Sequence, residues 1–277
     1  MWHIVSDSSC DLFQLPEQDA DIRFSTVPFS IHISGEEYRD DDRISVDQML
    51  TANENSSSMA HTACPSPQDW LDQFSGDGPI LAFTISSALS GSYNSANTAK
   101  EMLLEEEPER EIAVIDTRAT GPETVLLIRK AAELIHQGKT LADIEAALKA
   151  EAERTHIVFA LSSYHNLIKA GRVSRLVGLI AGHLGFWGIG IGSDEGEISM
   201  RGKARGMNGM IRFMAEEIKK TGLAGTRVVI CHCLNEKGAR MLKEKLCEAF
   251  RQITVDIMPT RGLDSYYAER SGLIVCY

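Results

Sequence analysis

A loop rich in hydroxyl groups is the part of this sequence whose residue types are best suited to chemistry. The apolar run Ile80–Ile85 is followed by Ser86-Ser87-Ala88-Leu89-Ser90-Gly91-Ser92-Tyr93 and then by a helical pattern. A strand-to-helix loop directs free backbone N–H groups and the positive end of the helix dipole toward a ligand. With Gly91 allowing close approach, the loop suits a carboxylate or a phosphate. The alternative, that the hydroxyls only cap the helix, fits the pattern equally well.

Two further polar stretches could contribute to an anion site. In Thr62-Ala63-Cys64-Pro65-Ser66-Pro67, two prolines favour an extended backbone that would hold Thr62 in place, or the stretch is only the approach to a helix. In Ala170-Gly171-Arg172-Val173-Ser174-Arg175, an arginine could pair with an anion through two hydrogen bonds, or cap a helix. Alone, neither stretch decides between binding and structure.

Other chemical motifs are missing or incomplete. The sequence contains no Gly-x-Ser-x-Gly elbow, no phosphate-binding P-loop and no His-Glu-x-x-His metal motif. Gly188-Ile189-Gly190-Ile191-Gly192 is not followed by the helix that a dinucleotide site requires. Cys231-His232-Cys233 lies on an expected strand, where adjacent side chains point to opposite faces, and no second ligand pair follows. We therefore expect no metal, no organic cofactor and no catalytic residue.

Charge and composition exclude several classes of partner. The 277 residues include 28 Lys and Arg against 39 Asp and Glu, a net charge of −11. A protein that binds nucleic acid or an anionic membrane surface needs a basic face, so neither partner is expected. The most apolar window, Leu176–Gly192, is too short for stable membrane insertion. Six cysteines without a disulfide framework or a signal peptide indicate a cytoplasmic location.

Strands and helices must alternate in the first half of the chain to position these loops. The expected strands are Trp2–Val5, Val27–Ile33, Ile80–Ile85, Glu111–Ile115 and Ile157–Leu161, and the expected helices begin at Ser45 and Ser66 or span Tyr93–Glu107, Pro122–Gln137 and Thr140–Arg154. This alternation predicts an α/β domain with a mostly parallel sheet flanked by helices. We assign residues 1–157 to this domain, which carries the candidate binding loops.

The remaining residues, 158–277, do not continue the regular alternation of strands and helices. The expected elements are helix Arg175–Leu184, hairpin strands Trp187–Gly192 and Glu197–Arg201, helix Met207–Lys220, strand Arg227–Cys231, helix Glu236–Phe250, and strands Ile253–Met258 and Leu273–Cys276. The turn Ser193-Asp194-Glu195-Gly196 is typical of a hairpin, which pairs its strands antiparallel. The pattern predicts a second, smaller α/β domain with a partly antiparallel sheet.

Several of these motifs, taken in order, make the chain resemble the DegV family across nearly its whole length. The residues that carry the resemblance are Ser6-Asp7-Ser8-Ser9, Val27-Pro28-Phe29-Ser30-Ile31, Tyr38-Arg39-Asp40-Asp41, Thr62 to Pro67, Ile85 to Tyr93, Val114-Ile115-Asp116-Thr117 and Ala170-Gly171-Arg172-Val173-Ser174. The segment Ile85 to Tyr93 is the most specific of them. One such motif would be a weak signal, whereas this many in one order is a strong one.

The resemblance implies a two-domain DegV-like fold that holds one long-chain fatty acid between its domains. It implies that Thr62 and Ser90 bind the carboxylate, and that the backbone of Gly91 and Ser92 assists. Some family members are the binding subunit of bacterial fatty acid kinase, so a fatty acid kinase catalytic subunit is the expected protein partner. The fatty acid is then the only expected ligand, and the protein is not itself an enzyme.

The sequence departs from the family pattern in two places. The family commonly has Lys-Pro where this chain has Trp187-Gly188, and a histidine near the C-terminus whose nearest counterpart here is Tyr266. Tyrosine can donate a hydrogen bond but carries no charge at neutral pH. Tyr266, Arg205 and Arg172 are further candidates for polar contacts. Arg205 matches a basic position linked in the family to phosphate or partner contact, or is simply an exposed charge.

An acyl chain also needs apolar walls. We expect them from helix Leu176–Leu184 and from the strand around Phe186, Trp187 and Ile189, the alternative being that these residues form only the second core. At about 0.8 kcal/mol per buried methylene, a long chain supplies on the order of 10 kcal/mol, so few polar contacts suffice. The second hypothesis is an acyl- or phosphoryl-transfer enzyme that uses the serine-rich loop, although His61 is the only histidine in the motif loops.

Overall fold

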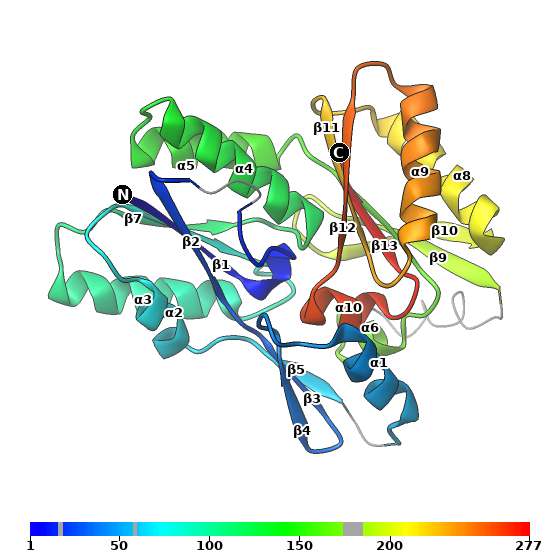
Figure 1. Ribbon diagram of the computed structural model, residues 1–277, viewed down its shortest axis with the longest axis horizontal. Coiled ribbons are helices and arrows are strands. Elements are labelled where there is room, and N and C mark those ends of the chain that lie inside the picture. The colour runs from blue at the N-terminus through cyan, green and yellow to red at the C-terminus, as the bar shows by residue number, and fades with distance from the viewer. Residues whose placement is uncertain (16–18, 58–59, 174–184) are drawn as a thin grey trace.

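The computed structural model describes residues 1–15, 19–57, 60–173 and 185–277, and its strands form three sheets (Figure 1). The parallel sheet has the order β2-β1-β6-β7, with β1 Trp2–Asp7, β2 Ile22–Val27, β6 Ile80–Thr84 and β7 Ile112–Asp116. All of its neighbouring strands run parallel. This arrangement confirms the sheet that the alternation of strands and helices predicts.

The mixed sheet has six strands in the order β10-β9-β8-β13-β11-β12. They are β8 Ile157–Leu161, β9 Phe186–Gly192, β10 Ile198–Arg205, β11 Arg227–His232, β12 Thr254–Pro259 and β13 Leu273–Cys276. Only β11 and β12 are parallel, which confirms the expected partly antiparallel sheet. The hairpin between β9 and β10 turns where the Gly196 N–H donates to the Ser193 carbonyl. The division into domains at residue 157 stays a prediction.

A small antiparallel sheet of order β4-β3-β5 is inserted in the chain between β2 and β6 of the parallel sheet, with β3 Ser30–Ile33, β4 Glu36–Arg39 and β5 His61–Ala63. The single strand expected over Val27–Ile33 is wrong. Val27 ends β2 in the parallel sheet, and Ser30 begins β3 in the small sheet. Pro28 lies between them and has no N–H to donate to a sheet, so the extended chain changes sheets at this point.

Most of the helices begin where the sequence predicts. The helical elements are η1 Ser8–Cys10, α1 Val46–Asn55, α2 Pro67–Gln73, α3 Ser92–Glu106, α4 Pro122–His136, α5 Leu141–Ala152, α6 His165–Lys169, α8 Gly206–Thr221, α9 Glu236–Ala249 and α10 Gly262–Ala268. The side chains of Ser45, Ser66 and Thr140 cap α1, α2 and α5. The helix predicted over Arg175–Leu184 lies outside the described residues. Among the described helices, none is long and apolar enough to cross a membrane.

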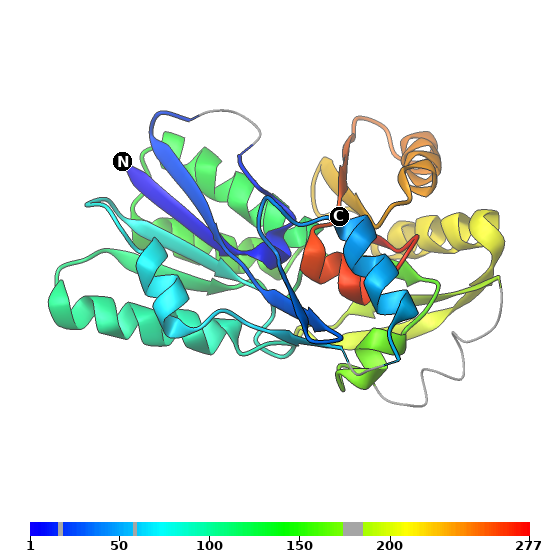
Figure 2. The same ribbon diagram turned by 60° about the horizontal axis from the view of Figure 1, so that its bottom comes forward.

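The elements stack in layers, with α4 between the two large sheets (Figure 1). One core lies between the parallel sheet and helices α2 and α3, and another between the mixed sheet and helices α8 and α9. The third and largest core fills the space around α4 and is shared by both sheets. Because strand side chains alternate, Ile4 packs in this shared core and Val5 in the outer one. Figure 2 shows α1 beside α10, which brings an early helix against a late one.

Candidate functional site

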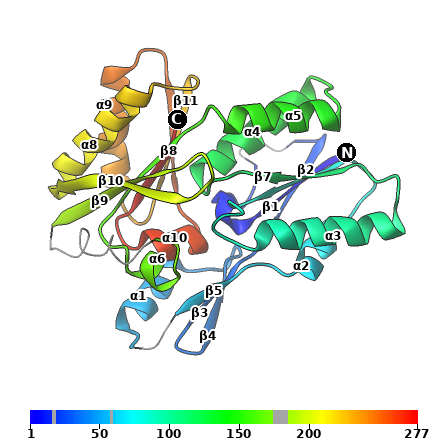
Figure 3. The ribbon, with the colours of Figure 1, turned by 180° about the vertical axis from the view of Figure 1, so that it is seen from behind.

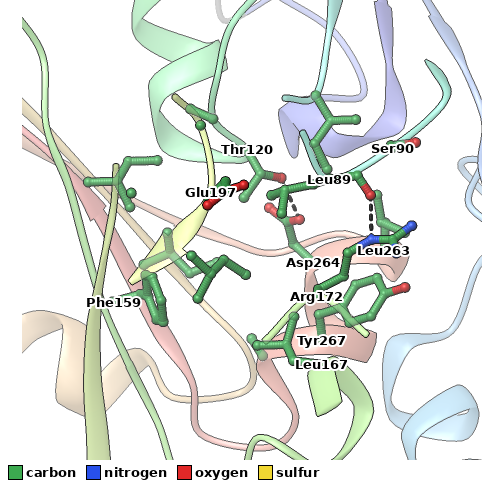
Figure 4. A pocket seen from close by; sticks show the side chains of 18 of the residues that line it. Leu89, Ser90, Thr120, Phe159, Leu167, Arg172, Glu197, Leu263, Asp264 and Tyr267 are labelled. Atoms are coloured by element: carbon green, nitrogen blue, oxygen red, sulfur yellow. Dashed lines mark hydrogen bonds between the residues drawn. The ribbon is translucent and has the colours of Figure 1, made fainter. Parts of the chain in front are cut away.

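A cavity of about 200 Å³ lies where the carboxyl ends of the parallel strands meet the mixed sheet (Figure 4). In open α/β sheets this edge is where ligands bind, because the loops after several strands converge there. The residues that line the cavity after β6 and β7 include Ser90 and Thr120, and those opposite include Phe159 and Leu263. The cavity is therefore built jointly by the two large sheets.

One face of β8 forms an apolar wall of the cavity. Ile157, Phe159 and Leu161 alternate along this strand and all three line the cavity, whereas their neighbours point into the core beneath α8. The adjacent strand carries glycine on the same face, and a Cβ at Gly190 would lie 2.3 Å from the Phe159 ring. The Gly-Ile-Gly-Ile-Gly pattern of β9 thus leaves room for the aromatic ring that the cavity needs.

The walls predicted from β9 are wrong in part. Trp187 and Ile189 point to the opposite face of the mixed sheet and pack in the core with α8 and α9, which is the alternative that the sequence left open. The ring of Phe186 lies under the side chains of Lys203 and Arg205, at the far end of the strand from the cavity. The other predicted wall, Leu176–Leu184, lies outside the described residues.

Hydroxyl groups from distant parts of the chain meet at one end of the cavity. Thr62 on β5 and Ser90 in the loop before α3 both line it, together with Gly91, the N-cap residue of α3. The Thr62 hydroxyl lies 2.8 Å from the Tyr267 hydroxyl of α10. The Ser90 hydroxyl accepts a hydrogen bond from the backbone N–H of Ser92. Three of the four predicted carboxylate-binding residues are therefore brought together.

Ser92 does not line the cavity. Its side chain is buried and its hydroxyl donates to Oδ2 of Asp7 at 2.7 Å, whereas the carboxylate contact expected of its backbone stays a prediction. Asp7 also accepts hydrogen bonds from the Ile85 backbone N–H and from Ser9. Burial raises the pKa of the Asp7 carboxyl, while these hydrogen bonds act in the opposite direction. Asp7 ties the end of β1 to the loop and to α3, a role that sequence analysis missed.

Arg172 and Arg205 lie in different places. Arg172 lines the cavity, and its Nε donates to the carbonyl of Leu89 at 2.5 Å (Figure 4). It thereby joins the segment after α6 to the serine-rich loop. Arg205 is exposed at the end of β10, with its guanidinium 5.9 Å from the centre of the Phe186 ring, and does not line the cavity.

The tyrosine at the cavity is Tyr267 and not Tyr266. Tyr266 is only 1% exposed and packs in the shared core, where burial raises the pKa of its hydroxyl. Consecutive residues on a helix cannot face the same side, whereas Leu263 and Tyr267 are four apart and both line the cavity. This spacing is the signal that could have selected Tyr267, had α10 been predicted as a helix.

The chemistry of the cavity is set by the residue types of its lining. A serine nucleophile needs a base within hydrogen-bond reach, and among the described residues that line the cavity there is no histidine. The one described group that could hold a metal, Asp19, Asp21 and His136, is not part of the lining. The lining contains hydroxyls and a helix start at one end and the apolar face of β8, together with the charged side chains of Arg118, Arg172, Glu197 and Asp264.

The chain is similar to known proteins along nearly its whole length. The profile of the DegV family of uncharacterised proteins matches residues 1–265. The chain is 38% identical to the DegV domain-containing protein spr0652 of Streptococcus pneumoniae, over 100% of this chain and 98% of that one.

Two solved structures are similar over the whole fold. The Fak (fatty acid kinase) B3 protein of Streptococcus pneumoniae, loaded with linoleic acid, is 38% identical with a TM-score of 0.97, covering 100% of this chain and 98% of that one. A DegV family protein from Eubacterium eligens, loaded with heptadecanoic acid, is 34% identical with a TM-score of 0.95. The match covers 100% of this chain and 99% of that one. Family profile, relatives and fold agree along the chain, which therefore belongs to the DegV family.

Proposed function

We propose that this protein binds one long-chain fatty acid in the cavity between the parallel and mixed sheets. The observation that carries the proposal is that the hydroxyls of Thr62 and Ser90 and the apolar face of β8 line one and the same cavity. The carboxylate lies at Thr62 and Ser90, with the N–H groups at the start of α3, and the acyl chain runs along Phe159 and its neighbours on β8. The structures of similar proteins loaded with linoleic and heptadecanoic acid support this assignment.

The energetics of such a ligand suit this site. Each buried methylene contributes about 0.8 kcal/mol, so the chain supplies most of the affinity and the polar end mainly fixes orientation. A helix start and two hydroxyls satisfy a carboxylate without a basic patch. The net charge of −11 is thus compatible with an anionic ligand, because the anion meets local dipoles rather than the surface charge.

The protein acts as a carrier and not as a catalyst in this proposal. It presents the carboxylate end of the fatty acid at the cavity mouth to the catalytic subunit of a fatty acid kinase. The similarity to the Fak B3 protein supports that partner, and the lack of a histidine among the described lining residues supports the non-catalytic role.

The proposed function is tested by identifying what the purified protein carries. Protein isolated under native conditions and then denatured should release a long-chain fatty acid, detected by mass spectrometry at about one molecule per chain. As a control, the Thr62→Ala/Ser90→Ala double variant should carry less. A stringently delipidated protein that takes up no fatty acid from solution would refute the proposal.

A further inference from the structure

Two buried carboxyl groups face each other where the halves of the molecule meet. Asp11 follows η1 at the end of the parallel sheet, and Asp264 lies on α10 beside the mixed sheet. They are only 3% and 4% exposed. Asp264 also lines the cavity, next to Thr120 (Figure 4). The carboxylate site proposed above does not use either group.

Each carboxyl has one oxygen satisfied by a neighbour. Asp11 Oδ1 accepts from the Arg261 backbone N–H at 2.6 Å, and Asp264 Oδ1 accepts from the Thr120 hydroxyl at 2.7 Å. The Oδ2 atoms of both acids are buried and have no protein donor. Both approach the same point beside Gly121, because a Cβ at that residue would lie 2.6 Å from Asp264 Oδ2 and 3.0 Å from Asp11 Oδ2. The two unsatisfied oxygens are therefore neighbours.

The nearby cation does not neutralise this pair. Arg261 is 1% exposed and donates its guanidinium N–H groups to the carbonyls of Leu12 and Asp40. Its Nε lies 3.5 Å from the Asp40 carboxylate, which offsets its charge. That carboxylate is further satisfied by the backbone N–H groups at the start of α10. Arg261 and Asp40 thus form one balanced pair, and Asp11 and Asp264 form a second pair of like charge.

Among the described residues, the other elements around the two acids bring no cationic side chain to them. From β11, the buried thiol of Cys231 lies near both acids and within hydrogen-bonding reach of Asp11. On α4, Glu123 is engaged by the Thr155 hydroxyl at 2.8 Å. Burial raises the pKa of Asp11 to about 7, and burial followed by the charge of Asp11 raises the pKa of Asp264 well above its ordinary value. Like carboxyls this close ionise in two steps that belong to the pair.

We propose that Asp11 and Asp264 share one proton, and that this acid pair is a positioning device for the fatty-acid cavity. The shared proton satisfies both Oδ2 atoms and holds α10 against η1 and the start of α4. Helix α10 in turn carries Leu263 and Tyr267 into the cavity, and Tyr267 contacts Thr62 at the mouth. When the proton leaves, two buried negative oxygens repel each other and α10 loses this position. This inference rests on the proposed function.

The first measurement is fatty-acid affinity as a function of pH. Equilibrium dialysis with radiolabelled hexadecanoic acid, below its aggregation concentration, is carried out between pH 6 and pH 9, where the free acid is already ionised. The affinity of the natural protein should fall toward the alkaline end of this range, because binding requires the last proton of the pair.

Two variants separate the shared proton from a general packing role. In Asp11→Asn or Asp264→Asn the amide oxygen keeps the existing hydrogen bond, and the amide N–H₂ donates to the remaining acid at every pH. Both variants should bind hexadecanoic acid with an affinity that stays constant from pH 6 to pH 9. The matched control is Glu123→Gln, another buried acid with a pKa raised to about 7, which should keep the pH dependence of the natural protein.

An infrared measurement keeps the test independent of the ligand and of how the pair variants fold. In Glu123→Gln protein at pH 7, the carbonyl stretch of a protonated carboxyl should be present. Its absence, or the same pH profile in the natural protein and both asparagine variants, would overturn the inference. A protein that binds no hexadecanoic acid at any pH contradicts the proposed function, whereas binding that is strong and independent of pH contradicts only the acid pair.

Discussion

The serines of the loop after β6 have different tasks, although they look alike in the sequence. Ser90 faces the cavity, whereas the hydroxyls of Ser86, Ser87 and Ser92 donate to the carbonyl of Gly196 and to Asp116 and Asp7. Ser86, Ser87 and Ser92 thus hold the loop in place, because the acceptors of their hydrogen bonds lie far away in the chain. Ligand binding and loop positioning are thus divided between neighbouring residues of the same type.

Removal of a single hydroxyl at the cavity mouth should therefore weaken binding without unfolding the loop. We expect Ser90→Ala and Thr62→Ala each to reduce fatty-acid affinity by about 1–3 kcal/mol, the range for a hydrogen bond to a charged group. Isothermal titration of delipidated protein measures this effect. Ser75→Ala is the control, because its exposed hydroxyl contacts Arg23 outside both the loop and the cavity, so its loss should leave the affinity unchanged. Unaltered affinity in both test variants would place the carboxylate elsewhere.

At the scale of elements, the hairpin between β9 and β10 connects the mixed sheet to the loops of the parallel sheet. Its tip reaches the loops after β6 and β7, as Figure 3 shows from behind. There the Ser86 hydroxyl donates to the Gly196 carbonyl at 2.7 Å, and Arg118 donates to the Asp194 carbonyl. Gly196 has a φ of +79°, and a Cβ on it would lie 2.3 Å from the Ser86 hydroxyl. The contact requires glycine for both conformation and space.

Gly196→Ala should accordingly destabilise the protein more than a glycine replacement that only strains the backbone. The comparison is Gly138→Ala after α4, where φ is +70° but nothing lies within 4 Å of the new Cβ. We expect the Gly138 variant to lose about 1–2 kcal/mol of unfolding free energy. The Gly196 variant should lose about 1–3 kcal/mol more, because the hairpin must also shift away from Ser86. Urea unfolding of both variants measures the difference. Equal losses of unfolding free energy would show that the contact between Gly196 and Ser86 can accommodate an added methyl group.

The long elements could be predicted from the sequence because their signals are local. Ser66 with Pro67 and Asp69 specified the start of α2, and the structure contains that capping box. The short elements carried no such signal. Helices α6 and α10 have five and seven residues, too few to show a period, and β5 has three. Strand β5 carries Thr62 and helix α10 carries Tyr267, so the hydroxyl end of the cavity depends on the least predictable elements.

At the scale of the whole molecule, several carboxyls are buried with raised pKa values, so stability should depend on pH. Glu123 on α4 is 5% exposed, and burial raises its pKa from 4.5 to about 7. Between these values the folded protein keeps a proton that the unfolded chain has lost. The unfolding free energy should therefore fall as the pH rises from about 4.5 to 7, and this contribution should level off above pH 7.

The contribution of Glu123 can be isolated with Glu123→Gln, which keeps the acceptor for Thr155 and removes the titration. Each proton taken up on folding changes the unfolding free energy by about 1.4 kcal/mol per pH unit. The variant should thus show a shallower fall than the natural protein when urea unfolding is compared at pH 5, 6 and 7. Asp11 and Asp264 still titrate in both proteins, so the difference between them reports on Glu123. Parallel pH profiles would mean that its carboxyl stays ionised.

The site was predictable where segments carry their own pattern and unpredictable where it depends on contacts across the molecule. Thr62, Ser90 and Gly91 stand in local motifs whose order along the chain carries the resemblance to the DegV family, and that resemblance implied their role. The roles of Asp7 and Asp264 arise from partners on other elements, such as Ile85 and Thr120, and no local spacing indicates them. The glycines of β9 likewise depend on partners elsewhere, because Gly190 makes room for the Phe159 ring and Gly188 for the Tyr164 ring.

The position of β13 in the mixed sheet has a consequence for how the protein is made. This strand lies between β8 and β11, and the ribosome synthesises it after both of its neighbours. Until it emerges, β8 and β11 cannot be part of one sheet, and each has an edge that lacks its final partner and could pair with another chain. Residues Leu273–Cys276 are the strand that joins them. The cavity wall on β8 is thus completed only after the chain beyond β12 has left the ribosome.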